Sequence, residues 1–241
     1  MIAMQDDAMS SETPPAEPAV AAVTSGPPRV VLFDFDGVLI HGDAFSLFMR
    51  DRYTHSLLRK LMIVPTLPWL LLSWPFSWRR PVRTLVHVGL FGVGEQRYAK
   101  TVRAFAAELV RRPKLFNRDG LQALRRHQAA GDRVIVVTGC EHALVTGILD
   151  ELGLRDLEVL ASRLRPSWLG MRVQLHNVGR RKLQQLAAHG VREWQLAYSD
   201  SSMDLPMLKP AAEAVLVNGT PALCKKIEKA LGRSVTRVEW F

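Results

Sequence analysis

Residues 30–38 of this 241-residue chain read VVLFDFDGV. The run at 30–35 predicts a strand buried on both faces of a parallel sheet, ended by the Asp36-Gly37 turn. Further strands are predicted at 134–137, 194–199 and 214–217, with helices between them at 119–130, 141–152 and 178–189. This alternation is typical of an α/β fold with a doubly wound parallel sheet. Residues 158–175 read as extended, with a hairpin around 167–170.

The chain divides into three predicted parts. Residues 1–28 are rich in Pro, Ala, Ser and Glu and predict a disordered tail; the acidic pair Asp6-Asp7 argues against a signal peptide. Residues 44–114 are too long for a single crossover helix and predict an inserted helical cap. Residues 29–43 and 115–241 would then form the catalytic core.

Composition limits the partners and the compartment. Two cysteines exclude a disulfide framework, and no Cys/His cluster has zinc spacing, so a reducing compartment such as the cytoplasm is expected. The formal charge of +9 favours anionic partners, namely phosphorylated substrates, lipid headgroups or nucleic acid, or simply a basic solvated surface. Since no aromatic–basic motif is present, we do not expect nucleic acid.

Two pairs of acids follow predicted strands. Asp34 and Asp36 end the first strand, and Asp200 and Asp204 follow the strand at 194–199. Each acid alone could be a turn residue or a helix cap. Because ligands bind at the carboxyl ends of parallel strands, however, the two pairs together indicate one site. Carboxylates so close repel unless a proton or a cation intervenes, and Mg²⁺ suits such oxygens.

Two further motifs fit an anionic substrate. Thr138-Gly139 follows a strand and could hold phosphoryl oxygens with a hydroxyl and a backbone amide, although Thr-Gly is also an ordinary turn. Lys182 ends a basic run at 180–182 and could neutralise phosphoryl charge. Spacing does not say which of the three basic residues points inward.

Along the chain these motifs follow in the order acid pair, hydroxyl, lysine, acid pair. This order, within residues 30–43 and about 134–217, resembles the haloacid dehalogenase-like superfamily. The resemblance implies a Mg²⁺-dependent phosphatase. In it Asp34 is the nucleophile and a metal ligand, and Asp36 is the general acid/base with its main-chain carbonyl on the metal. Thr138 and Gly139 bind phosphate, Lys182 clamps charge, and Asp200 binds metal. Asp204 is a ligand or a neighbour that positions one. Dehalogenases of this superfamily lack the second acid, so Asp36 favours a phosphatase; a mutase keeps both acids.

The predicted cap contains an uncharged stretch, residues 61–78, LMIVPTLPWLLLSWPFSW, flanked by basic residues on both sides. Three prolines within it argue against a spanning helix and favour a helical hairpin that dips into one leaflet of an anionic membrane. The alternative is that this stretch forms the cap's own core or a dimer contact.

Among capped members, the chain resembles phosphatidylglycerophosphatase C of bacteria and, more broadly, phosphoserine phosphatases. Asp43 stands where the latter have a Glu that contacts the substrate amine, so the resemblance implies a substrate-binding role for it. The favoured hypothesis is a phosphatase of a lipid phosphate such as phosphatidylglycerophosphate, peripheral on the cytoplasmic face of the inner membrane. The alternatives are a soluble phosphatase of a small metabolite, phosphoserine-like or a sugar phosphate, and a non-catalytic membrane-binding protein of the same fold.

Overall fold

The fold is built on one seven-stranded sheet. A computed structural model describes residues 28–77 and 79–241, so the predicted tail lies outside the described residues except for Pro28. The strands follow the order β4-β3-β2-β1-β5-β6-β7, and every neighbouring pair is parallel except β3 and β4. Their bounds are β1 (Val30–Phe33), β2 (Arg133–Glu141), β3 (Glu158–Ser167), β4 (Gly170–Leu175), β5 (Leu196–Ser199), β6 (Glu213–Val217) and β7 (Thr236–Val238). The predicted α/β fold class is confirmed.

The predicted strands are found within a few residues, with two differences. The prediction that β2 ends before Thr138-Gly139 is wrong, because the strand continues through these residues to Glu141 with a shift of register against β3. A turn dipeptide can lie inside a strand where the ladder is irregular. The short edge strand β7 was not predicted, since three residues carry too little pattern. The expected hairpin is present as β3 and β4.

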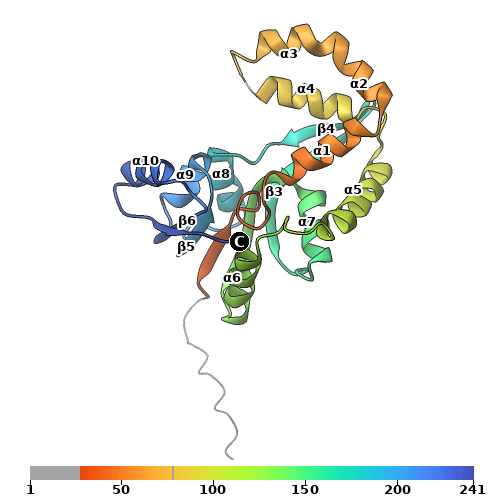
Figure 1. Cartoon of the computed structure of the whole chain (residues 1–241). Coiled ribbons are helices and arrows are strands. Elements are labelled where there is room, and N and C mark those ends of the chain that lie inside the picture. The colour runs from red at the N-terminus through yellow and green to blue at the C-terminus, as the bar shows by residue number, and fades with distance from the viewer. Residues whose placement is uncertain (1–27, 78) are drawn as a thin grey trace, which may run out of the picture.

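Helices cover both faces of the sheet, which explains its continuous apolar runs. Val31 and Phe33 enter one cluster with α1 (Ala44–Thr54), α5 (Glu95–Val110), α6 (Arg118–Ala129) and α7 (His142–Glu151). Leu32, between them, points to the other face and packs with α8 (Arg180–Ala188), α9 (Leu205–Leu208) and α10 (Pro221–Leu231). Figure 1 shows the two helical layers on either side of the strands.

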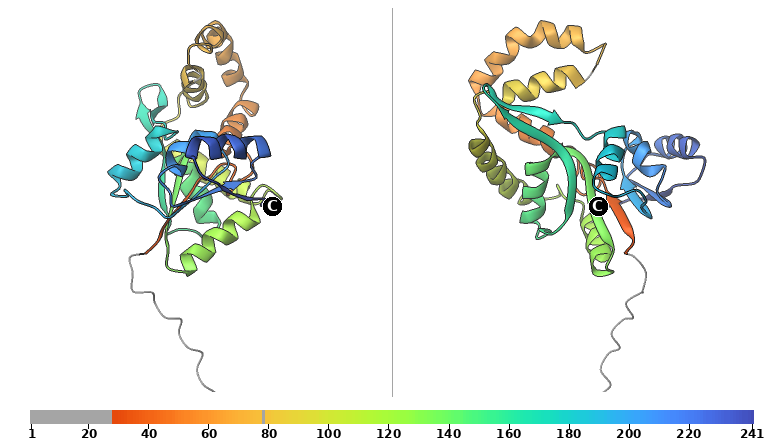
Figure 2. Two further views of the ribbon diagram at one scale, coloured as in Figure 1. Left: turned by 90° about the vertical axis from the view of Figure 1, so that its left-hand side faces the viewer. Right: turned by 180° about the vertical axis from the view of Figure 1, so that it is seen from behind.

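The inserted stretch after β1 is helical. After α1 come α2 (Leu57–Ile63), a 3-10 turn at Val64–Thr66, α3 (Leu67–Ser73) and α4 (Arg79–Gly89). In Figures 1 and 2, α2 and α3 bend outward from the body and α4 returns beneath them. We call the segment from Leu57, at the start of α2, to Gly89, at the end of α4, the arm. By contrast, α5 packs against the core through Val102 and Phe105.

The arm exposes large apolar side chains. Leu71 and Phe76 keep 74% and 77% of their surface exposed. The other exposed apolar residues of the arm are Leu57, Leu58, Leu61, Val64, Leu67, Trp69, Leu72 and Trp74. Within residues 28–77 and 79–241, no single helix has the length and apolarity to cross a bilayer. By length and composition alone, α1 and Leu57–Ser73 pass together as a pair bent by 105°.

Candidate active site

A cleft of about 570 Å³ opens at the carboxyl edge of the sheet. It lies where the strand order diverges, because β1 has β2 on one side and β5 on the other, and such switch points hold the ligands of open α/β folds. Most of the predicted site residues line this cleft: Asp34, Asp36, Asp43, Gly139, Lys182, Asp200 and Asp204. Segments that are up to 170 residues apart in the chain therefore meet at one point.

Lys182 is the basic residue that points inward. It leaves only 2% of its surface exposed, whereas Arg180 and Arg181 are exposed. Its Nζ lies 3.0 Å from Asp34 Oδ2 and 2.8 Å from Asp204 Oδ1. Burial works against the charge, but the two carboxylates raise the pKa of Lys182 above its ordinary value. The side chain is therefore a fixed cation at the floor of the cleft.

Asp34 and Asp204 share this cation but differ in their surroundings. Asp204 has both oxygens engaged, since Oδ1 meets Lys182 and Oδ2 accepts a hydrogen bond from the Ser199 hydroxyl at 2.7 Å. Against the effect of burial, these partners hold the pKa of Asp204 below its ordinary value. Burial and the nearby charge of Asp204 raise the pKa of Asp34 well above its ordinary value.

Asp36 is built to carry a proton near neutral pH. Its Oδ1 accepts the backbone N–H of Ala44 at 2.8 Å, and the Thr138 hydroxyl lies 3.5 Å from Oδ2. Burial, and after it the charge of Asp43, raises the pKa of Asp36 to about 7. A carboxyl group with this pKa can exist in both protonation states at physiological pH, as general acid/base catalysis requires.

Thr138 lies behind the cleft wall. It is fully buried, accepts the backbone N–H of Cys140 at 2.9 Å and faces Asp36, whereas Gly139 lines the cleft itself. Cys140 is also buried, which raises the pKa of its thiol. The structure thus brings Thr138 to Asp36 rather than to the open cleft.

Asp200 lies against the turn that follows β1. Gly37 has φ +76°, and a Cβ added there would come within 2.0 Å of Asp200 Oδ2. Only glycine therefore fits, both for its backbone conformation and for this close approach. Burial, followed by the charge of Asp204, raises the pKa of Asp200 to about 6. The sequence predicted the turn at Gly37 but not its contact with Asp200.

The cleft offers oxygen donors of the kind that a hard divalent cation binds. Five carboxylates line the cleft, and among the described residues that line it Lys182 is the only Lys or Arg. Burial first, and neighbouring carboxylates after it, raise the pKa values of Asp34, Asp36 and Asp200, so a bound cation would stabilise their charged forms. Across the described chain, no three carboxylate, imidazole or thiolate groups converge to hold a metal. A cation would therefore need main-chain or water oxygens beside carboxylates such as Asp34 and Asp200.

On the cap side of the cleft, Asp43 is the residue that the sequence analysis had singled out. Asp43 caps α1 by accepting the Ser46 N–H at 2.6 Å and lines the cleft as well. Phe45, Val82 and His176 complete the walls from α1, α4 and the loop after β4. No local pattern marks them, because their position depends on how the arm folds back over the sheet.

The model of haloacid dehalogenase-like hydrolases matches residues 31–209. The chain belongs to this family. Its membership confirms the predicted superfamily and the expectation of a hydrolase.

Solved structures agree with this haloacid dehalogenase-like fold. A protein of unknown function from Bordetella pertussis Tohama I is 20% identical with a TM-score of 0.66, over 87% of this chain and 99% of that chain. A HAD family hydrolase from Salmonella enterica subsp. enterica serovar Typhi is 14% identical with a TM-score of 0.60, over 89% of this chain and 70% of that chain. A substrate-bound phosphoserine phosphatase is 16% identical with a TM-score of 0.54, over 88% and 94%. At these identities the likeness is one of fold.

Proposed function

We propose that this hydrolase is a Mg²⁺-dependent phosphatase that forms a phosphoaspartate on Asp34. The observation that carries the proposal is the pairing of two carboxylates with different tasks in one cleft. Asp34 is held 3.0 Å from Lys182, and Asp36, two residues on, has a pKa of about 7. A fixed nucleophile beside a proton carrier is the arrangement that covalent hydrolysis of a phosphate ester needs.

The proposed reaction has two steps. In the first, a carboxylate oxygen of Asp34 attacks phosphorus, the bond from phosphorus to the leaving oxygen breaks, and Asp36 gives that oxygen its proton. In the second, Asp36 takes a proton from water, the water oxygen attacks phosphorus, and the bond to Asp34 breaks to release inorganic phosphate. Lys182 stabilises the charge that the phosphoryl oxygens carry in both transition states.

Asp34 and Asp200, with the main-chain carbonyl of Asp36, are the groups proposed to hold the metal. When bound, Mg²⁺ offsets the repulsion between these acids and an anionic substrate. Asp204 already uses both oxygens on Lys182 and Ser199, so we assign it to positioning Lys182. Gly139 lines the cleft and is the residue proposed to meet the phosphate, while Thr138 orients Asp36.

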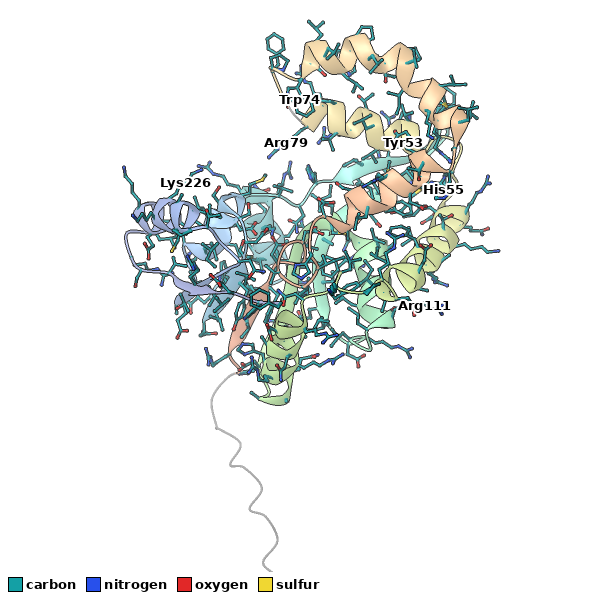
Figure 3. The ribbon with its side chains drawn as sticks, in the orientation of Figure 1. Tyr53, His55, Trp74, Arg79, Arg111 and Lys226 are labelled. Carbon is teal, nitrogen blue, oxygen red and sulfur yellow. The ribbon has the colours of Figure 1, made fainter. Side chains whose placement is uncertain are left out.

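For the substrate we propose a lipid phosphate, with phosphatidylglycerophosphate as one candidate. The support comes from the arm, whose apolar residues are exposed rather than packed into a core of their own. Basic residues stand at both ends of the apolar stretch, at 59–60 and 79–80, and suit anionic headgroups. Figure 3 shows Trp74 at the free end of the arm, and Arg79 nearby at the start of α4, on the side of the arm that faces the body.

A small polar metabolite is the second candidate substrate class. Two observations favour it: phosphoserine phosphatases share the fold, and the acid Asp43 lines the cleft where a substrate amine could bind. The two classes differ in what the arm does, since a soluble phosphatase gains nothing from a membrane.

A phosphate-release panel tests the reaction. It contains p-nitrophenyl phosphate, phosphoserine, a sugar phosphate and phosphatidylglycerophosphate in detergent, each with Mg²⁺ and with a chelator. We expect release with Mg²⁺ and none from Asp34→Asn, while the exposed Asp156→Asn keeps full activity. Release by Asp34→Asn at the rate of the unchanged protein would refute the assignment of the nucleophile.

Vesicle flotation tests the membrane. The vesicles are equimolar phosphatidylglycerol and phosphatidylcholine. Each large apolar side chain that inserts fully contributes about 1.5–3 kcal/mol, so we expect Leu71→Gln combined with Phe76→Ser to lower the bound fraction strongly. Phe241→Ser is the matched control, because Phe241 is 78% exposed but lies at the C-terminus, outside the arm. Equal binding by all three proteins would remove the support for a lipid substrate and leave the phosphatase intact.

A further inference from the structure

A second, smaller chamber adjoins the catalytic cleft. We call it the side slot; it has a volume of about 60 Å³ and lies between α1, α4 and the β3–β4 hairpin. Phe45, Val82, Gly139 and His176 line both the cleft and the slot, so the two spaces share a wall. Because Gly139 belongs to this wall, the slot begins beside the phosphate-binding end of the cleft.

The slot is lined mainly by hydrocarbon. Six apolar side chains form it: Phe45, Val82, Val86, Leu164, Val173 and Leu175. Two of its polar residues already have partners. The Ser162 hydroxyl donates to Gly139 O at 2.6 Å, and the Glu141 carboxylate accepts the Tyr98 hydroxyl and two backbone N–H groups. A polar ligand group would therefore find little in the slot to replace its hydrogen bonds with water.

Three ionisable residues line the slot: Glu141, Arg83 and His176. Arg83 is exposed on α4. The pKa of His176 is lowered by burial, and then by the charges of Arg79 and Arg83, which favours a neutral imidazole. The wall that the slot shares with the cleft is thus uncharged: phenylalanine, valine, glycine and a neutral histidine.

We propose that the side slot holds a short hydrocarbon segment of the leaving group, close to the phosphate. The substrate class is then a phosphomonoester of an alcohol whose carbon chain starts next to the ester oxygen. Among lipid phosphates this favours an alkyl phosphate over phosphatidylglycerophosphate, whose ester oxygen stands on a hydroxylated glycerol. This inference deepens the proposed function and rests on it for the position of the phosphate. At about 10–15 Å³ for each water-sized group, the slot takes roughly four to six such groups, or a chain of about four carbons.

Binding of alkylphosphonates in Mg²⁺ buffer tests the slot without any turnover. Methyl-, ethyl-, butyl- and octylphosphonate are titrated against the full chain by calorimetry. Since each buried methylene contributes about 0.8 kcal/mol, we expect Kd to fall about three- to fourfold per carbon as far as butyl and then to level off. A Kd that does not depend on chain length would overturn the proposal.

Two variants of β4 change the size of the slot in opposite directions. Val173→Phe fills the slot, so we expect the Kd values of methyl- and butylphosphonate to differ less than twofold. Leu175→Ala enlarges it and is expected to move the plateau from butyl toward octyl. Gln174→Phe is the matched control for the added ring, because Gln174 is exposed on the opposite face of the same strand and should leave the series unchanged.

The outcomes separate the slot from the reaction. An unchanged rise of affinity with chain length in Val173→Phe, with its thermal transition intact, would overturn the slot. If Val173→Phe does not fold, Leu175→Ala decides, and an unmoved plateau overturns the proposal. If the chain hydrolyses no phosphate ester but the phosphonate series behaves as expected, the proposed function fails while the slot stands.

Discussion

Replacing Lys182 with Met tests the electrostatic design of the site. Met keeps an unbranched side chain of similar length but removes the ammonium group, so Asp34 and Asp204 lose their bonds of 3.0 Å and 2.8 Å. Both carboxylates stay buried, and a carboxylate buried without a partner is strongly destabilising. We therefore expect the variant to fold with lower stability and to lose phosphatase activity.

The size of the effect follows from the burial of the group. Breaking a buried ion pair by removing one partner costs about 3–5 kcal/mol. For a chain of this size, each kcal/mol lowers Tm by about 2–4 °C, so the expected loss is roughly 6–20 °C. The loss depends on pH. Without Lys182 the folded-state pKa of Asp34 rises further above its unfolded value, so the variant is least affected in acid and loses stability as pH rises through that pKa.

Thermal unfolding of the metal-free protein at about pH 5 and about pH 8 measures both effects. Lys226→Met is the control, because Lys226 is exposed on α10 (Figure 3) and its loss should change stability by less than about 0.5 kcal/mol. If Lys182→Met had the Tm of the unchanged protein at about pH 8, Asp34 and Asp204 could not both be buried and dependent on Lys182 as described above.

Three further predictions test other parts of the site. Gly37→Ala should lower Mg²⁺ affinity, measured by calorimetry, at least about tenfold, because the added Cβ overlaps Asp200. Gly232→Ala, at φ +69° with open space around it, should cost only about 1 kcal/mol of folding stability and leave Mg²⁺ affinity unchanged, so equal affinity in the two variants contradicts the prediction. The pKa values of Asp36 and Asp200 are raised to about 7 and about 6, so the metal-free protein loses stability as pH rises through these values. Mg²⁺ should therefore raise Tm more at about pH 8 than at about pH 5, and an equal rise of Tm at both pH values would argue against a metal at this site. Tyr98→Phe should cost about 1.5–3 kcal/mol in denaturant unfolding because Tyr98 donates to the Glu141 carboxylate at 2.6 Å, and Tyr53→Phe, whose partner is the neutral carbonyl of Leu85, should cost less; the reverse order would refute the charge-assisted bond.

Much of the fold could be predicted because its signals are local. The β1 strand is buried on both faces, so its apolar run is unbroken and marks both the strand and its end at Asp34. The strand ends also located the acids after β1 and β5, because the carboxyl ends of parallel strands meet at one edge of the sheet. The resemblance of the motifs to a family then supplied roles for them that spacing alone does not give.

The remaining features depend on tertiary contacts that no local pattern records. The partner of Asp204 is Lys182, which lies 22 positions earlier in the chain, and the sequence left open whether Lys182 or a neighbouring arginine points inward. The continuation of β2 through Thr138 requires its irregular pairing with β3. Val82 reaches the cleft only because α4 folds back over the sheet. Each of these needs the packed chain.

The bond from Ala44 N–H to Asp36 joins two regions that otherwise look separate. Ala44 is the first residue of α1 and so begins the inserted helices, while Asp36 is the proposed general acid/base. This 2.8 Å contact lowers the pKa of Asp36 against the larger effect of burial. A tilt of α1 that lengthened this bond would raise the pKa of Asp36 and make it a weaker acid, so a movement of the insertion would reach the proposed general acid through one amide.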